Sequence, residues 1–510
     1  MSALAPNTPV IVGVGFVQNH ADDPLACPEP YRLMVDALRE AAADAGSAAL
    51  LGDIESISVQ QGMWQYSNPG RLIADALGCP GARSILADLG VLQITPLAEL
   101  CSAIAAGEQQ LGVVTGGEAK YRDLRSKITG VPVAMTEQAE DTPPPDVHHR
   151  SADPFATEVE AKRGIFLPVE LFSVIESALR HHQGLGIEEH RDKLAQLYSG
   201  FSEIASRNPH AWRRERVTAE AIRNPGGNNA MIAFPYTKLH NSQWNVNQAV
   251  AIIVCSVAKA RELGLDESRW VYPLATAQSK HVVCLAQQRQ LHSHPGTVVA
   301  GERAMALAGV APGDIAVADL YSCFPSAVQS FAQDLHLDGV CPLSVTGSMA
   351  FAGGPYNHGA LDGVARMAEV LRSGEGMAAS TRRVGLVSNL SGIFGKQGVA
   401  LFANEPGAAG YRFEDVTAAV AAQDPPLPVT ADYAGPATIV GYAVSYQKGQ
   451  LSHGFAYCDT PAGERTVARC QDAALLERMT REEYCGRSVL IAADGSFSEA
   501  DESGARTACA

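Results

Sequence analysis

The sequence has 510 residues, 46% of them hydrophobic and 18% charged, and a formal net charge of −16. This composition is ordinary for a soluble protein, but the chain is too long for one hydrophobic core, and roughly three or four domains are expected. The acidic balance argues against a nucleic-acid partner or an anionic membrane surface, and no apolar run approaches the ~20 residues that a membrane-spanning helix needs.

Residues 1–120 alternate between strand and helix patterns. The expected strands are residues 9–15, 54–61, 84–90 and 111–117, and the expected helices are residues 31–46, 68–78 and 95–107. Gly46 is expected to close the first helix. Thr95 is expected to be the N-cap of the third helix, with Pro96 as its first residue. This order predicts an α/β unit.

The same order returns later in the chain. An Ala-Gly pair followed by Gly-Asp-Ile occurs within residues 45–54 and again within residues 308–315. A helix, a Gly-Glu pair and a buried strand follow one another at 104–117 and again at 371–389. Several elements that match in order predict a duplicated α/β fold. The alternative is that any two strand–helix–strand units share such turns.

Composition divides the rest of the chain. Residues 121–236 are richer in charged and aromatic residues and are predicted to form an inserted loop domain. The two α/β halves are then expected at 1–120 with 237–268, and at 269–408. An acidic, proline-rich stretch at 421–436 is typical of a linker. Short strand patterns beyond it predict a small β-rich domain at 425–510.

The cysteine and histidine spacings favour no disulfide framework and no metal site. Eleven cysteines are scattered without a Cys-x-x-Cys pair, which indicates reduced thiols and a cytoplasmic protein. The pairs at 148–149 and 181–182 are the nearest approach to a histidine cluster, and their polar surroundings indicate solvated surface. The first residues carry no charged region ahead of an apolar stretch, so no secretory signal is expected.

One short stretch, DLYSCFPSAV at 319–328, looks like the corner of an active site. An apolar run stops at Pro325 and a helical pattern follows. Corners between strands and helices expose backbone N–H groups and side chains to pockets. Cys323 in this corner is a candidate nucleophile, a candidate acid or a structural residue.

Four motifs resemble those of thiolases: VTGGEA at 114–119, DLYSCFPSAV at 319–328, FAGGPYNHG at 351–359 and GIFGKQGVALF at 392–402. The resemblance covers about residues 1–405 and is strongest to thiolase-like proteins type 1, which carry an extra C-terminal domain. It implies an α/β fold: a duplicated thiolase fold with αβαβα layers, an inserted loop domain and a small C-terminal β-barrel-like domain. It also implies a site for coenzyme A or an acyl-CoA, with no covalently bound cofactor.

The family's nucleophile and activating histidine are both replaced on this alignment. Thiolases place a nucleophilic cysteine at the start of the helix after the third strand, and counting back from Gly107 puts that position at Gly90. The next cysteine, Cys101, lies inside the helix and is expected to pack in the core. A Gly-His-Pro loop becomes Gly353-Gly354-Pro, so that Gly354 stands where the histidine is expected.

Other family positions are partly kept. The His-Asp-Cys-Phe motif of sterol-carrier-protein thiolases corresponds to residues 321–324, where Tyr321 replaces the histidine and Cys323 is retained. In that family the cysteine moves a proton at the substrate's α-carbon. His358 is near enough in sequence to lean into the pocket, or else it is a surface histidine. Asn389 occupies the region of the family's Cys-x-Gly motif, and Lys396 precedes a glutamine where relatives often carry histidine.

Coenzyme A recognition is expected in the inserted segment. Trp212 is a candidate to stack on adenine, and Arg213 and Arg214 are candidates to meet phosphates. The alternative is that these residues form a solvated helix start. The C-terminal segment, 425–510, holds seven Lys and Arg against eleven Asp and Glu. A nucleic-acid groove needs the opposite balance, so a packing or partner-docking role is preferred.

Three functions remain open at this point. One is non-covalent acyl-CoA chemistry, either proton transfer or retro-aldol cleavage, with Tyr321 or Cys323 moving the proton. Another is a non-catalytic acyl-CoA carrier or the scaffold of a complex with a small partner subunit. The last is a true thiolase with Cys323 as a displaced nucleophile. The chain is expected to be a monomer or a homodimer.

Overall fold

The computed structural model describes residues 4–377 and 382–500. Its first sheet has the strand order β1-β8-β4-β2-β3-β5. β8 pairs antiparallel with β1 and with β4, whereas β2 and β3 run parallel to β4 and to each other. The strands are β1 (Pro9–Gln18), β2 (Ser56–Gln60), β3 (Arg83–Ala87), β4 (Leu111–Ala119), β5 (Val147–His149) and β8 (Asn247–Ser256).

The second sheet repeats this pairing, as the duplication predicts. Its order is β10-β11-β12-β9-β13. β12 is antiparallel to both of its neighbours, and β10 is parallel to β11. β9, β12, β11 and β10 therefore correspond in order and direction to β1, β8, β4 and β2. The strands are β9 (Tyr272–Ser279), β10 (Ile315–Asp319), β11 (Val384–Ser391), β12 (Lys396–Ala403) and β13 (Arg412–Asp415).

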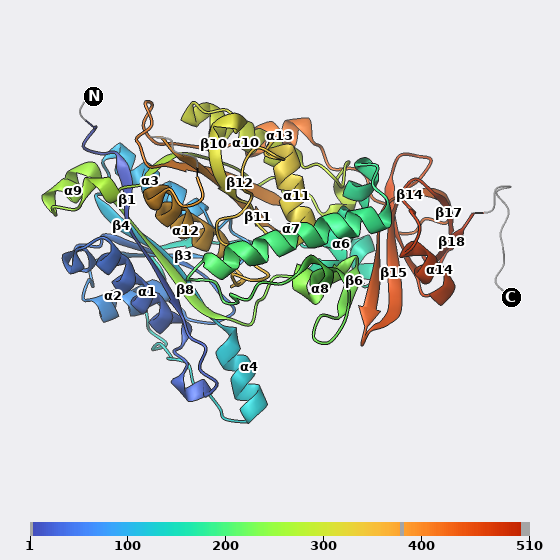
Figure 1. Ribbon diagram of the computed structural model, residues 1–510, viewed down its shortest axis with the longest axis horizontal. Helices are drawn as coiled ribbons and strands as arrows, with labels where there is room; N and C mark the ends of the chain where they lie inside the picture. The colour runs from blue at the N-terminus through green and yellow to red at the C-terminus, as the bar shows by residue number, and fades with distance from the viewer. Residues whose placement is uncertain (1–3, 378–381, 501–510) are drawn as a thin grey trace.

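Helices lie between the sheets and on their outer faces (Figure 1). α3 (Thr95–Ala106) and α12 (Gly359–Ser373) contact strands of both sheets and form the middle layer. α1 (Pro30–Asp44) and α2 (Pro69–Leu77) cover the first sheet, and α10 (Pro295–Ala308) with α11 (Pro325–Asp334) flanks the second. The molecule thus has the αβαβα order that the resemblance to thiolases implies.

One detail of α3 differs from the expectation. Thr95 is the first residue of the helix rather than its N-cap, and Ile94 holds the capping position. The Thr95 hydroxyl instead donates to Gln278 Oε1 on β9, at 2.7 Å. The helix end is buried against the second sheet, so the hydroxyl finds a partner there and not in its own helix. Gly46 follows α1 with a φ of 78°, the left-handed conformation that a helix-ending glycine supplies.

Helix α6 (Pro168–His182) of the inserted segment lies between the core and the C-terminal strands, because it contacts α11 on one side and the C-terminal sheet on the other. The elements of the segment are α4 (Lys120–Thr129), β5, α5 (Glu158–Lys162), α6, α7 (Ile187–Arg207), α8 (Ala219–Arg223), β6 (Met231–Phe234) and β7 (Tyr236–Thr237). β5 joins the first sheet beside β3, and β6 pairs with a strand of the C-terminal sheet. The chain returns to the first sheet through β8 and α9 (Val257–Glu262). The domain boundaries expected from the sequence remain a prediction.

The C-terminal strands form a third, antiparallel sheet, linked to the core through α13 (Thr417–Gln423). Its order is β16-β15-β14-β17-β18, and a single bridge between Arg469 and Ser496 joins its two ends. It packs on α6, where Arg180 pairs with Glu483 at 3.0 Å. The elements are β14 (Gly435–Gln447), β15 (Gln450–Asp459), β16 (Arg465–Cys470), α14 (Ala473–Met479), β17 (Ser488–Ile491) and β18 (Phe497–Glu499). Within the described ranges, no helix is both long and apolar enough to span a bilayer.

Candidate active-site cavity

A large cavity opens where loops of both α/β halves meet the inserted segment. Its volume is about 950 Å³. Gly90 and Gln93 line it from the first half, and Tyr321, Cys323 and Lys396 line it from the second. The cavity therefore lies between the two α/β halves and is lined by loops of both.

Tyr321 and Cys323 lie in the loop that joins β10 to α11. The Tyr321 amide donates to Ser388 Oγ on β11 at 2.8 Å, which ties the loop to the neighbouring strand. The Cys323 carbonyl accepts from the Ser242 amide at 3.2 Å. Burial raises the pKa of the Cys323 thiol to about 12 and raises the pKa of Tyr321 above its ordinary value. Both groups therefore keep their protons near neutral pH.

Gln93 is a site residue that the sequence reasoning missed. Its Nε2 donates to the Tyr321 phenolic oxygen at 3.2 Å and to the Tyr356 carbonyl at 3.3 Å, and its Oε1 accepts from the Ala360 amide at 2.6 Å. Gln93 thus sits where α3 and α12 both begin. Its place two residues before the expected helix start at Thr95 was the available signal.

Gly90 lines the cavity but supplies only backbone. Its φ of 97° is a left-handed conformation that favours glycine. Its carbonyl accepts from Lys396 Nζ at 2.8 Å and from Ser391 Oγ at 2.9 Å. The Gly90 loop is therefore held by the β11–β12 hairpin, and the side chain that this loop aims at Tyr321 is that of Gln93.

Gly354 lines the cavity, and its Cα lies against the side chain of Ser242. A Cβ at this position would overlap with Ser242 Oγ and lie 3.0 Å from Ser242 Cβ. Ser242 lines the same cavity. In this conformation the Ser242 hydroxyl occupies the position that the Cβ of any side chain at position 354 would need.

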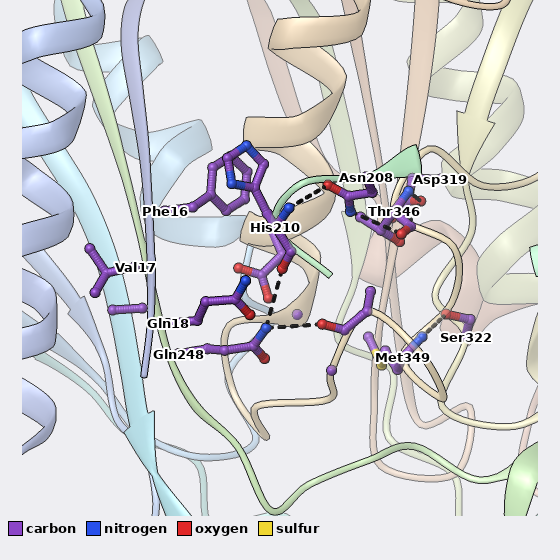
Figure 2. Close-up of a pocket in the computed structure, with 15 residues that line it drawn as sticks. Phe16, Val17, Gln18, Asn208, His210, Gln248, Asp319, Ser322, Thr346 and Met349 are labelled. Atoms are coloured by element: carbon purple, nitrogen blue, oxygen red, sulfur yellow. Dashed lines mark hydrogen bonds between the residues drawn. The ribbon is translucent and has the colours of Figure 1, made fainter. Parts of the chain in front are cut away.

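Gly353 faces a smaller pocket of about 40 Å³ on the other side of the same loop. Figure 2 shows how side chains there hold the loop's backbone. Gln248 Nε2 donates to the Ala352 carbonyl at 2.9 Å, Asn208 Nδ2 donates to the Thr346 carbonyl at 3.0 Å, and the Met349 amide donates to Ser322 Oγ at 3.0 Å. This pocket positions the loop that carries both glycines.

His358 and Asn389 are buried behind the cavity and do not line it. His358 packs against Gly116 of β4, and a Cβ added to Gly116 would overlap with the Cβ of His358. The His358 Nδ1 lies 3.5 Å from Asp362 Oδ1. Asn389 Oδ1 accepts from the Ile94 amide at 3.3 Å, directly before α3. The structure thus places both residues in support of the helix starts.

Lys396 lines the cavity, and its positive charge is neutralised by a neighbouring carboxylate. Its Nζ donates to Ser151 Oγ at 3.0 Å and forms an ion pair with Asp153. Burial would raise the pKa of Asp153, but hydrogen bonds from Lys396 and Ser151 outweigh it and lower this pKa. Because its ammonium group is already paired, this lysine is less suited to bind a phosphate.

Of the three expected coenzyme A contacts, only Trp212 lines the cavity. Its indole stacks on His20 with ring centroids 3.8 Å apart. Arg213 and Arg214 lie outside the lining, and Arg214 Nη2 donates to the Ser206 carbonyl at 3.2 Å. The exposed Lys238 also lines the cavity, and it ends the stretch FPYTK at 234–238 that the sequence offers for coenzyme A recognition.

Large apolar side chains surround the cavity without being buried themselves. Their exposed fractions run from 37% to 56%, and they are Leu89, Phe155, Leu167, Trp244 and Tyr356. Deeper in, Phe172 and Phe324 stack with centroids 4.6 Å apart. An apolar wall with few charges suits an acyl chain or an apolar partner surface.

Comparison with known proteins supports the expected family resemblance. Residues 415–496 match the thiolase-like protein type 1 additional C-terminal domain. The acetyl-CoA acetyltransferase of Methanothermobacter thermautotrophicus is 27% identical over 342 residues, which cover 62% of this chain and 83% of that protein. The resemblance to thiolase-like proteins type 1 is therefore confirmed.

Two solved structures share the fold. A monomeric SCP2-thiolase like protein type 1 from Mycobacterium smegmatis superposes with a TM-score of 0.79 at 24% identity, over 98% of this chain and 100% of that chain. An Ltp2–ChsH2(DUF35) aldolase superposes with a TM-score of 0.59 at 18% identity, over 79% of this chain and 99% of that chain. The expected thiolase fold is thereby confirmed.

Proposed function

We propose that this chain, which has the thiolase fold and carries the thiolase-like protein type 1 additional C-terminal domain, binds coenzyme A or an acyl-CoA in the large cavity. We further propose that it moves a proton at the acyl group without forming a covalent acyl-enzyme. The observation that carries the proposal is the pairing of a protonated phenol and a protonated thiol, Tyr321 and Cys323, in a cavity where Gln93 stands just ahead of α3.

The thiols of the cavity are poorly suited to nucleophilic attack. Cys323 and Cys284 line it, and burial raises their pKa values to about 12 and about 11. At pH 7 roughly one Cys323 in 10⁵ is a thiolate, since each pKa unit is a factor of ten. Cys101 lies inside α3 with 1% exposure and does not reach the cavity.

The same protonation states favour the role of an acid. In a retro-aldol cleavage the β-hydroxyl loses its proton to a water molecule, the Cα–Cβ bond breaks and releases an aldehyde or ketone, and the enolate of the thioester takes up a proton at Cα. Tyr321 or Cys323 would supply that last proton, and in α-proton exchange the deprotonated form of the same group would first remove it. Gln93 donates to the phenolic oxygen, which leaves the phenolic hydrogen free to point into the cavity.

Trp212 and Lys238 support binding of the coenzyme A portion at the cavity's edge, by ring contact and by attraction to phosphate. The apolar wall supports an acyl group at the other end. No metal and no covalently bound cofactor enters this proposal. We place the protein in the cytoplasm because its eleven cysteines are scattered without a Cys-x-x-Cys pair, which indicates reduced thiols.

A second function is favoured by the exposed apolar side chains around the cavity. A non-catalytic acyl-CoA carrier or scaffold would use them to dock a small partner subunit. The Ltp2–ChsH2(DUF35) aldolase contains a DUF35 component and shares this fold. In that case acyl-CoA binds, no proton exchange occurs with the chain alone, and a second subunit co-purifies.

Titration calorimetry with coenzyme A and with an acyl-CoA, followed by α-proton exchange in D₂O, separates these outcomes. Binding with exchange supports the enzyme, and binding without exchange supports the carrier. If millimolar coenzyme A neither releases heat nor raises the melting temperature, both functions are wrong.

A further inference from the structure

Two aromatic side chains, Trp244 and Tyr356, form a corner of the large cavity. Both line it, and their rings meet edge to face, with centroids 5.6 Å apart and 89° between the planes. Their exposed fractions are 47% and 38%, so a large part of each ring is open to a ligand. We call this pair the aromatic corner, and the proposed function assigns no particular ligand group to it.

Tyr356 is tied directly to the proposed proton donor Tyr321. The Gln93 Nε2 atom donates to the Tyr321 phenolic oxygen at 3.2 Å and to the Tyr356 carbonyl at 3.3 Å. One nitrogen atom therefore contacts both the phenol and the backbone of the corner residue. Tyr356 thus lies beside the end of the cavity where the acyl group of a bound ester would react.

Trp244 is held beside the other proposed proton donor, Cys323. The Ser242 amide, two residues before Trp244, donates to the Cys323 carbonyl at 3.2 Å, and the Gly354 amide donates to the Gln243 carbonyl at 2.9 Å. The first bond links this segment to the loop of the proton donors, and the second links it to the loop that carries the other ring. Backbone hydrogen bonds therefore place the aromatic corner next to the reacting groups.

The backbone of Tyr356 has a conformation that is unfavourable for a large side chain. Its φ of 49° is in the left-handed region, and its amide donates to the Gly354 carbonyl at 2.8 Å in a tight turn. Glycine or asparagine adopts this conformation more easily. Holding a large ring here, with 38% of its surface exposed, therefore costs stability, as is common where a side chain contacts a ligand.

We infer that the aromatic corner selects an acyl-CoA whose acyl group carries an aromatic ring close to its α-carbon. Aromatic rings prefer edge-to-face or offset contacts, and two rings at right angles offer both a face and an edge to a third ring. A straight chain covers the same surface only after losing its rotational freedom. The inference rests on the proposed function, because it names the acyl group that the same cavity would take.

The test compares acyl-CoA esters of equal carbon number by titration calorimetry with the full-length protein. Phenylacetyl-CoA is compared with octanoyl-CoA, 3-phenylpropanoyl-CoA is compared with nonanoyl-CoA, and coenzyme A alone is the reference. At least one aryl ester is expected to bind about tenfold more tightly than its straight-chain counterpart, because a well-placed aromatic contact contributes up to about that factor.

Two variants remove the rings one at a time. Trp244→Leu keeps an apolar side chain, and Tyr356→Asn introduces a residue that tolerates a φ of 49°. Each should lower the preference for the aryl ester by about threefold or more, while the affinity for the straight-chain ester stays within about twofold. A general loss of structure would instead weaken both esters alike. Phe166→Leu is the matched control, because Phe166 is 62% exposed and does not line the cavity.

The outcomes separate this inference from the proposed function. If the straight-chain esters bind as tightly as the aryl esters, or if the preference is unchanged in both ring variants, the inference is overturned and the proposed function stands. If neither coenzyme A nor any of the esters binds, the proposed function is wrong and the inference fails with it.

Discussion

Gln93 Nε2 donates to the phenolic oxygen of Tyr321 across 3.2 Å, and this bond joins the two halves of the duplicated fold inside the cavity. Gln93 comes from the loop before α3 in the first half, and Tyr321 from the loop after β10 in the second. The same amide also accepts from the first turn of α12. Gln93 therefore acts as a positioning residue for the phenol rather than as a reacting group.

The first prediction concerns this pair. Tyr321→Phe should lower α-proton exchange of a bound acyl-CoA by about 10²–10⁴-fold, because a general acid contributes a factor of that size. Gln93→Leu should lower exchange less, by about tenfold, and should leave acyl-CoA affinity nearly unchanged. Exchange is measured by mass spectrometry of the recovered acyl-CoA from D₂O. Tyr433→Phe, in the linker before β14, is the control. Unchanged exchange in Tyr321→Phe would remove Tyr321 from the mechanism.

The second prediction concerns the reactivity of Cys323. A thiol whose pKa is raised to about 12 gains thiolate with each unit of pH up to that value. Alkylation of Cys323 by iodoacetamide should therefore rise about tenfold per pH unit between pH 7 and pH 9, with no plateau. Peptide mass spectrometry follows this cysteine separately from Cys284. An alkylation rate that levels off near pH 8 would show a thiol with an ordinary or lowered pKa. It would favour the alternative in which Cys323 is the nucleophile of a true thiolase.

The third prediction concerns the space between Gly354 and Ser242. Gly354→Ala should lower the free energy of unfolding by ~1–3 kcal/mol, because the added Cβ overlaps with Ser242 Oγ. Ser242→Gly in the same chain removes the obstructing side chain and should recover most of that loss. Urea denaturation of the parent, both single variants and the double variant measures the coupling. Additive effects of the two substitutions would contradict the steric explanation.

The fourth prediction concerns pH and His240, which is fully enclosed beside Thr237. Burial lowers its pKa to about 4, and its Nδ1 accepts from the Thr237 amide at 3.2 Å. Since the folded pKa lies below the unfolded value of ~6.5, the contribution to stability is complete above pH 6.5 and is lost as pH falls toward 4. The loss is roughly 3 kcal/mol over this window.

The check is urea denaturation of the parent and of His240→Gln at pH 7.0 and pH 4.5. The variant is less stable at pH 7. Its free energy of unfolding should fall less between pH 7.0 and pH 4.5, because it lacks the one proton that His240 takes up on unfolding. Equal pH dependence in both proteins would mean that His240 does not titrate in this window. The control is Gln447→Ala, an exposed change that removes no titratable group and should leave the slope of the parent.

The architecture was predictable because it repeats. The strand and helix periods of residues 1–120 and the matching turns near positions 52 and 313 point to two equivalent sheets, and the observed pairing of β1-β8-β4-β2 with β9-β12-β11-β10 follows from that. The corner at Tyr321 and Cys323 was predictable for a similar reason, since a strand pattern stops there at a proline.

The details of the site depend on contacts between distant residues. Counting back from Gly107 located the loop but not which of its side chains turns inward, so that Gln93 was missed. Ser242 lies more than a hundred residues before Gly354, and nothing local to either residue indicates that they share one space. The burial of His358 could not be predicted, because it depends on contact with Gly116 of β4, which is distant in the sequence. β5 is a three-residue strand, too short to show a period.

The most direct test of the central claim is to incubate the protein with an acyl-CoA in D₂O and to record two masses from the same sample. The account predicts deuterium at the α-carbon of the recovered acyl-CoA and an unchanged mass for the intact protein. A protein mass increased by the acyl group, mapped to Cys323 or any other cysteine, would contradict it.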